Sequence, residues 1–181
     1  MTTFFLGGSR SISQLNAVTR DLLDEVIKGG HHVIVGDANG ADKAFQDYLS
    51  KKGYVDVTVF CAGGVCRNNL GGWKLAAVST LGTKGGFEHY AAKDRRMADL
   101  GDSGLFLWNG KSRGTLNSIQ MLLRRGRPVQ VYFSHKRSVV TINREQELEL
   151  ALEEKAAGPR PAGRSRGKGR AIPEAQRSLF S

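Results

Sequence analysis

The chain has 181 residues, 40% hydrophobic and 24% charged, with a formal net charge of +10 at pH 7. This composition excludes global disorder, and a chain of this length buries about two-thirds of its extended surface, so folding requires neither disulfides nor a metal. No apolar run approaches the roughly 18 residues that span a bilayer, and the N-terminal residues lack the basic region and apolar core of a signal peptide. We therefore expect a cytoplasmic protein without a membrane partner.

Short apolar runs alternate with helical patterns along the first part of the chain. The apolar runs end in glycine-rich turns, which is typical of strands, and the helical patterns place hydrophobic residues three or four apart. The predicted elements are a strand at 3–6, a helix at 15–27, a strand at 33–35, a helix opened by 39–42 and ended by Gly53, and a strand at 55–59.

Residues 61–87 hold seven glycines and show only a weak helical signal, around 74–78. A loop this long inside a compact domain is usually functional or mobile, so we expect a lid, an interface or an insertion. Cys61 and Cys66 lie here without a second cysteine pair, which argues against a disulfide scaffold and a zinc site of cysteines alone. A metal ion at these cysteines would need ligands from distant parts of the chain, and we predict no metal site and no cofactor.

The second half of the chain repeats the alternation. Its predicted elements are a helix at 88–100, a strand at 104–108, a helix at 116–124, strands at 128–133 and 138–142, and a helix at 144–157. Apolar strands that alternate with helices predict a mainly parallel sheet with helices on both faces. The sequence therefore predicts an α/β protein, with a single Rossmann-like domain at 1–157 and a disordered basic tail at 158–181.

Three glycine-rich turns follow predicted strands, at 7–10, 36–42 and 109–115, and we expect each turn to open a helix. Ligands of such sheets bind at the carboxyl ends of the strands, where glycines admit an anion to backbone amides and helix N-termini favour a phosphate. The alternative is that these glycines only make tight turns. The candidate ligand-binding residues are Gly7, Gly8, Ser9, Arg10, Gly36, Asp37, Gly40, Ala41, Asp42, Gly110, Ser112, Gly114 and Thr115, with Lys93 and Arg96 as a candidate phosphate clamp.

These turns carry a family resemblance. The segments G-G-S-R, G-D-x-x-G-A-D and L-W-N-G-K-S-R-G-T resemble the SLOG superfamily of Rossmann-like domains, and within it the YspA-like branch (domain of unknown function 2493). The superfamily also contains the LONELY GUY phosphoribohydrolases and the DNA-processing protein A-like domains. The resemblance covers roughly 3–133. It implies that the turns bind a nucleotide or nucleotide-derived ligand, that the protein is a sensor or regulatory module, and that it forms a homodimer.

The resemblance also implies an alternative, the cleavage of a nucleotide N-glycosidic bond. The phosphoribohydrolase pattern has a Glu three residues after its Thr and an Arg four residues before its Met, whereas this chain has Ser118 and Lys93 there. Glycosidic cleavage generally needs a carboxylate, which Asp37, Asp42 or Asp102 would have to supply. The catalytic residues and the activity itself therefore stay unassigned.

The tail is the most basic part of the chain. Residues 158–181 contain six basic residues and one acidic residue, a composition that contacts nucleic-acid backbones without sequence preference. At its end Gln176, Leu179 and Phe180 resemble the bacterial sliding-clamp-binding motif, in which the two apolar residues would anchor in a pocket. This indicates a third hypothesis, a DNA-associated interaction protein whose partners are DNA and the clamp. The alternative is a solvated linker.

Overall fold

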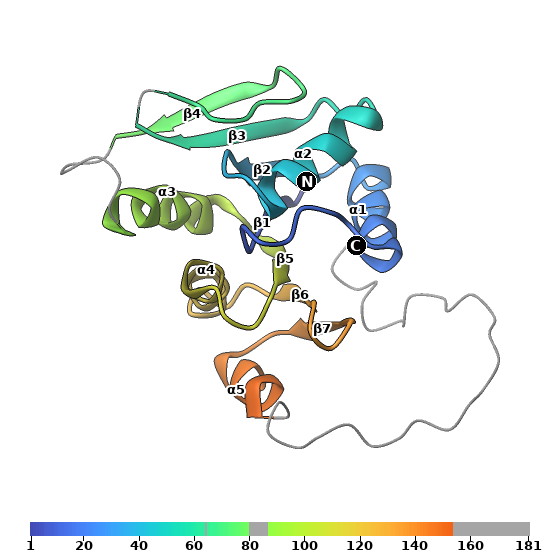
Figure 1. The fold of residues 1–181 in the computed structure, drawn as a ribbon, viewed down its shortest axis with the longest axis vertical. Coiled ribbons are helices and arrows are strands. Elements are labelled where there is room, and N and C mark those ends of the chain that lie inside the picture. The colour runs from blue at the N-terminus through green and yellow to red at the C-terminus, as the bar shows by residue number, and fades with distance from the viewer. Residues whose placement is uncertain (64, 80–86, 154–181) are drawn as a thin grey trace.

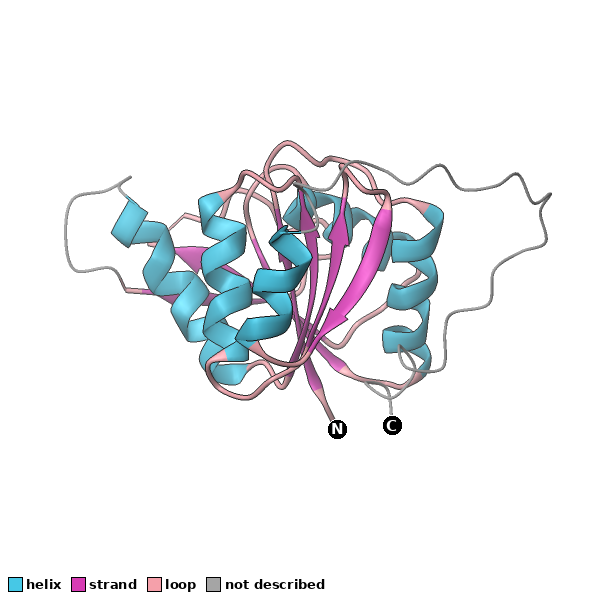
Figure 2. Cartoon of the chain, turned by 90° about the horizontal axis from the view of Figure 1, so that it is seen from below, coloured by secondary structure: helices cyan, strands magenta, loops and turns pink. Residues whose placement is uncertain are grey.

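The computed structural model describes residues 1–63, 65–79 and 87–153, and within them seven strands form one sheet flanked by helices on both faces (Figures 1 and 2). The elements are β1 (Thr3–Gly8), α1 (Ala17–Lys28), β2 (His32–Gly36), α2 (Ala41–Lys51), β3 (Val57–Ala62), β4 (Lys74–Val78), α3 (Phe87–Leu100), β5 (Ser103–Trp108), α4 (Arg113–Leu123), β6 (Val129–Phe133), β7 (Ser138–Ile142) and α5 (Glu145–Glu153). The predicted Rossmann-like α/β fold is confirmed. The predicted tail lies outside the described residues.

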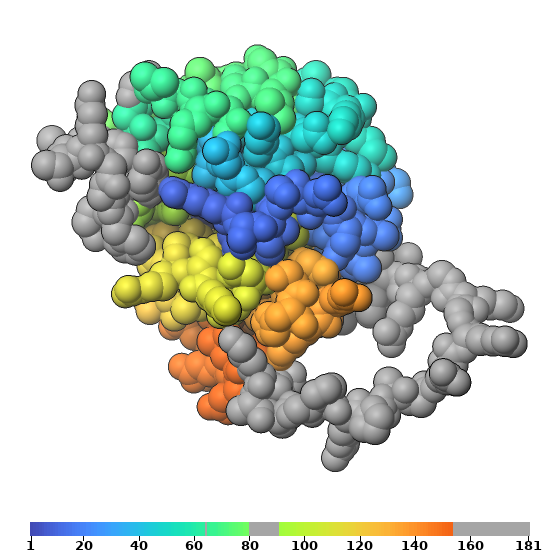
Figure 3. Space-filling model, in the orientation of Figure 1, coloured from blue at the N-terminus to red at the C-terminus, as the bar shows by residue number. Residues whose placement is uncertain are grey.

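The sheet has the strand order β4-β3-β2-β1-β5-β6-β7, and every pair is parallel except β6 with β7. The chain moves outward from β1 to β4 and then returns to place β5 on the other side of β1. Figure 3 shows the dark-blue residues around β1 between the cyan and the yellow parts of the molecule. In open α/β sheets, ligands bind where the strand order reverses in this way, which here is the carboxyl end of β1 and β5.

The sheet separates two hydrophobic cores because successive side chains of a strand point to opposite faces. Phe4 and Leu6 pack with buried residues of α1 and α2 on one face. Phe5 packs on the other face with buried residues of α3, α4 and α5. All six residues of β5 are buried, as expected for a central strand covered on both faces.

Three predicted elements were wrong in detail. The strand predicted at 55–59 is β3, which runs from Val57 to Ala62, so Cys61 lies on a strand and not in the long loop. The weak helical signal at 74–78 belongs to β4, an edge strand that pairs with β3 from Lys74 to Val78. Ala76 and Val78 pack on a core while Leu75 is exposed, so the burial alternates with the period of a strand. The helix predicted at 116–124 is α4, which begins at Arg113 because Ser112 supplies its N-cap.

Among the described residues, no helix is both long enough and apolar enough to cross a membrane.

Candidate functional site

A cavity of about 470 Å³ lies at the carboxyl end of β1 and β5. Its walls come from the turn after β1, from α3, from the first turns of α4 and from the loop after β3. Four basic residues line it, together with two carboxylates and several hydroxyl groups. The basic residues are Arg10, Arg67, Lys93 and Arg113, and the carboxylates are Asp42 and Asp94.

Close backbone packing positions the turn after β1. A Cβ atom on Gly8 would lie 2.3 Å from the Leu107 carbonyl oxygen and 2.8 Å from the Ala41 Cβ, so only glycine fits there. The Ser9 amide donates to the Leu107 oxygen at 2.8 Å, and the Ser9 oxygen accepts from the Ala41 amide at 3.3 Å. The turn is thereby fixed between β5 and α2.

The N-terminus of α4 opens into the cavity through a group of hydroxyls. Ser112 is the N-cap, and its hydroxyl accepts from the Thr115 amide at 3.3 Å and from the Thr115 hydroxyl at 2.9 Å. The Ser9 hydroxyl lies 3.5 Å from that of Thr115 and accepts from the Asn109 amide at 3.1 Å. The first amides of a helix have no acceptor within the helix and favour anions, so this end can hold a phosphate.

The first turn of α2 instead places one of the chain's own carboxylates in the cavity wall. Asp42 lies in the first turn, is 7% exposed, and accepts from the Ala38 amide at 3.2 Å. Burial raises the pKa of Asp42 from its ordinary value of 3.8 to about 6, against the opposing field of the Lys93 ammonium. A Cβ atom on Gly36 would lie 2.2 Å from the Asp42 Oδ2 atom and 2.5 Å from the Lys93 Nζ atom. Glycine at 36 therefore makes room for this charged pair.

Lys93 reaches the cavity from α3. Its Nζ atom lies 3.0 Å from the Asp94 Oδ1 atom, and its side chain is 6% exposed. Burial by itself lowers the pKa of Lys93, but the carboxylates of Asp94 and Asp42 outweigh burial and leave the pKa above its ordinary value. The buried ammonium is therefore charged and held by acids on two helices.

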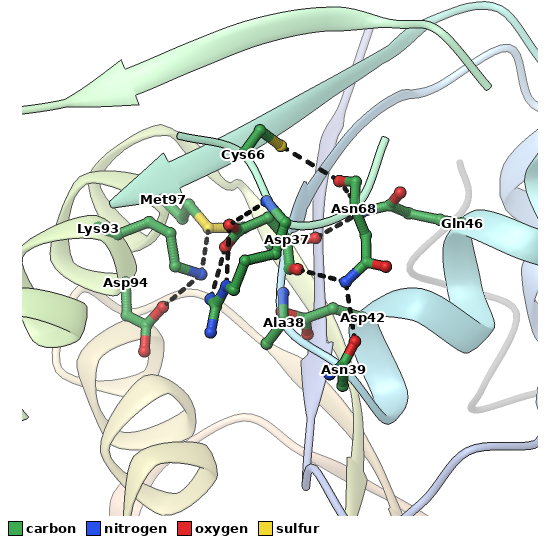
Figure 4. Close-up of polar contacts among 12 residues, drawn as sticks. Asp37, Ala38, Asn39, Asp42, Gln46, Cys66, Asn68, Lys93, Asp94 and Met97 are labelled. Carbon is green, nitrogen blue, oxygen red and sulfur yellow. Dashed lines mark hydrogen bonds and ion pairs between the residues drawn. The ribbon is translucent and has the colours of Figure 1, made fainter. Parts of the chain in front are cut away.

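A second polar cluster stands beside the cavity wall (Figure 4). Arg67 donates to both carboxylate oxygens of Asp37, at 2.7 Å from Nη2 and 3.1 Å from Nε, and its amide donates at 3.1 Å. Asn68 donates to the Asp37 carbonyl oxygen at 2.8 Å. Although burial acts to raise it, the pKa of Asp37 is lowered by the hydrogen bonds from the Arg67 side chain and amide and by the Arg67 charge. The loop after β3 is thereby tied to the end of β2.

The structure brings together nine of the sequence-predicted residues in the cavity wall: Gly7, Gly8, Ser9, Arg10, Asp42, Lys93, Ser112, Gly114 and Thr115. The other six do not line it: Gly36, Asp37, Gly40, Ala41, Arg96 and Gly110. Among these, Arg96 lines a separate cavity beside β4, and Gly110 lines a groove beside α5. The clamp-motif residues Gln176, Leu179 and Phe180 lie outside the described residues.

One expectation about the turns was wrong. We expected each glycine-rich turn to open a helix, but α1 begins at Ala17, well after Arg10, and its N-cap Asn16 accepts from the Thr19 amide at 2.8 Å. Residues 11–16 therefore carry the α1 N-terminus away from the cavity. Both departures from the phosphoribohydrolase pattern, Ser118 and Lys93, lie in the cavity wall itself.

Sequence reasoning missed Arg67 and Asp94 as parts of the cavity wall. Asp94 follows Lys93, which had been selected, but adjacent residues of a helix point in different directions. The sequence therefore did not indicate that Asp94 also faces the cavity. Arg67 lies in the glycine-rich stretch predicted only as a long loop. A single arginine in such a loop carries no periodic signal, and only the tertiary fold places it beside the turn after β2.

No family model and no curated protein matches the chain. Solved structures do match. DNA processing protein A from Helicobacter pylori superposes with a TM-score of 0.60 at 14% identity, over 83% of this chain and 73% of the other. That structure comes from a study of how the Helicobacter pylori protein binds single-stranded DNA. DNA processing protein A from Streptococcus pneumoniae superposes with a TM-score of 0.56 at 19% identity, over 72% of this chain and half of the other. At these identities the similarity establishes the fold.

Proposed function

We propose that the cavity binds single-stranded DNA by holding a backbone phosphate at the N-terminus of α4. The observation that carries this proposal is that Arg10, Arg67 and Arg113 line the same cavity as the Ser112 and Thr115 hydroxyls at the N-terminus of α4. Guanidinium groups and helix amides are the groups that most often contact phosphate oxygens in protein–DNA complexes. The similarity in fold to DNA processing protein A, whose single-stranded DNA binding has been described, supports the same reading.

The experiment is a fluorescence-anisotropy titration of the full chain with a labelled oligothymidylate at several salt concentrations. Arg113→Ala and Arg10→Ala should each weaken binding by roughly tenfold, because a charge-assisted hydrogen bond contributes about 1.5–3 kcal/mol, and should reduce the salt slope by about one. Arg20→Ala is the matched control, since Arg20 is exposed on α1 and does not line the cavity. If Arg113→Ala and Arg10→Ala bind like wild type, the cavity is not the DNA site.

A free nucleotide is the second candidate ligand, in keeping with a sensor of the YspA-like type. The cavity of about 470 Å³ supports it, because pockets for small ligands span about 300–1,000 Å³. A thermal-shift screen with nucleotides, nicotinamide dinucleotides and cyclic dinucleotides tests this directly, since a ligand at 100 times its Kd raises stability by about 2.7 kcal/mol. If a nucleotide stabilises the chain and competes with the oligothymidylate, the nucleotide is the ligand of the cavity and the DNA only occupies the same site.

The tail adds a separate proposal, which rests on sequence alone. We propose that residues 158–181 strengthen DNA binding through their basic residues and contact a sliding clamp through Gln176, Leu179 and Phe180. Replacing Leu179 and Phe180 by alanine should abolish retention on immobilised clamp and leave oligothymidylate affinity unchanged. If that variant is still fully retained on the clamp, the proposed contact of Leu179 and Phe180 with the clamp is wrong. Light scattering on the same samples measures whether the chain forms the homodimer that the family resemblance implies.

A further inference from the structure

We propose that Asp37, Cys61 and Cys66 form a binding site for a thiophilic divalent cation such as Zn²⁺. The two thiol sulfurs and one carboxylate oxygen of this group all lie within 4.8 Å of one another. The site is separate from the proposed phosphate site, because none of the three residues lines the cavity.

The parallel pairing of β2 and β3 brings these residues together. Gly36, the last residue of β2, pairs with Phe60. The residues that follow them, Asp37 and Cys61, therefore come side by side at the carboxyl edge of the sheet. Cys66 returns from the loop after β3, where its thiol donates to the Asn68 carbonyl oxygen at 3.2 Å. Figure 4 shows Cys66 and Asn68 beside Asp37. A cysteine of β3 and a cysteine of the loop after it thus meet the distant carboxylate that a metal site there would need.

The donor set suits zinc. Two thiolates and a carboxylate leave a fourth position for water in a tetrahedral site, with Zn–S distances of about 2.3 Å and Zn–O distances of about 2.0–2.2 Å. Sulfurs in such a site lie about 3.8 Å apart. Because the three ligand atoms all lie within 4.8 Å of one another, they are at most about 1 Å too far apart for this geometry.

The surroundings orient and balance the ligands. Arg67 holds the Asp37 carboxylate through both oxygens, in the way that hydrogen bonds from neighbouring groups commonly fix the ligands of a metal. Binding of the cation expels both thiol protons, so the ion, two thiolates and one carboxylate together carry a single negative charge. The Arg67 guanidinium and the buried Lys93 ammonium stabilise that charge.

The experiment uses the untagged full chain with both thiols reduced, and Co²⁺ as a spectroscopic substitute for Zn²⁺. Wild type should bind one Co²⁺ per chain with visible bands typical of tetrahedral coordination and a thiolate charge-transfer band in the near ultraviolet, and Zn²⁺ should displace it. Cys66→Ser should weaken Co²⁺ binding at least tenfold and remove part of the charge-transfer band. Asp37→Asn should weaken binding about tenfold while leaving the charge-transfer band. Asp47→Asn, which changes an exposed acid on α2, should bind like wild type.

Three results would overturn the proposal. The first is a Co²⁺ spectrum without thiolate charge transfer, and the second is unchanged affinity in Cys66→Ser. The third is rapid formation of a Cys61–Cys66 disulfide under mild oxidation together with no detectable metal binding, which would make the pair a redox couple. X-ray absorption of Zn²⁺-loaded wild type must show two sulfur ligands at about 2.3 Å, a measurement that does not depend on the folding of any variant.

Discussion

The N-termini of α2 and α4 stand at the same edge of the sheet after similar glycine-rich turns, yet the first turn of α2 carries an acid and α4 begins with a hydroxyl cap. At α2, Asp42 in the first turn places a carboxylate beside the helix end and accepts from the Ala38 amide, and Gly40 offers no side-chain cap. At α4, Ser112 caps the helix and Arg113 and Gly114 line the cavity. The difference shows that a glycine-rich turn before a helix does not define an anion site, because an acidic residue in the first turn already neutralises the helix dipole.

The largest expected effect concerns two glycines, Gly8, which packs against the first residue of α2, and Gly114, which lies in the first turn of α4. Gly8→Ala should lower the free energy of unfolding by about 3 kcal/mol, because the new Cβ would meet the Leu107 oxygen and Ala41. Gly114→Ala has open space around it and should raise the free energy of unfolding by about 0.5 kcal/mol through helix propensity. Urea denaturation of both variants checks the pair. Equal stabilities would mean that the turn after β1 is not packed as described.

The buried acid at α2 should give the next largest effect. The pKa of Asp42 is about 6 in the folded chain against 3.8 ordinarily, so the folded state binds this proton more tightly. Proton binding by Asp42 therefore stabilises the folded state fully below pH 3.8, and this stabilisation is lost as the pH rises through about 6. Asp42→Asn should gain stability over wild type across that window, to about 2–3 kcal/mol at pH 7.

Urea denaturation of wild type and Asp42→Asn at several pH values measures this difference. Asp47→Asn, on the exposed side of α2, is the control and should show no such dependence. A constant difference between Asp42→Asn and wild type would contradict the raised pKa of Asp42.

The same acid should make ligand affinity depend on pH. A phosphodiester stays ionised throughout this range, so an oligothymidylate without a terminal phosphate reports only the titration of the protein. Its affinity should rise several-fold as the pH falls through about 6, because protonation of Asp42 removes a negative charge from the cavity wall. In Asp42→Asn, anisotropy titrations should show that this component of the pH dependence is gone. If Asp42→Asn keeps the full pH dependence of affinity, a group other than Asp42 is responsible for it.

The smallest expected effect is at the N-cap of α4. Ser112→Ala should lower the free energy of unfolding by about 1 kcal/mol, because the Thr115 amide loses its acceptor. Arg113→Ala, an exposed change one residue away, should stay within about 0.5 kcal/mol of wild type. Thermal denaturation compares the two. A loss in Arg113→Ala as large as that in Ser112→Ala would mean that the side chain of Arg113 also supports the fold.

Most of the fold was predictable because its signals are local. Buried parallel strands such as β5 are apolar throughout, helices such as α1 repeat their apolar residues at helical spacing, and glycines mark the ends of both. The edge strand β4 was missed because only one of its sides packs on the core, and because β3 is its one neighbour in the sheet. A five-residue strand with an exposed side has too little pattern to be separated from a helix.

The sequence by itself determined the alternation of strands and helices, and with it the edge of the sheet at which Ser9, Ser112 and Thr115 would gather. Only the tertiary structure decided what surrounds these helix ends. The proximity of Lys93 to Asp42 and the contact of Arg67 with Asp37 join segments far apart in the chain. Spacing along a sequence records which face of an element a residue occupies, but distances between segments arise only when the sheet is assembled.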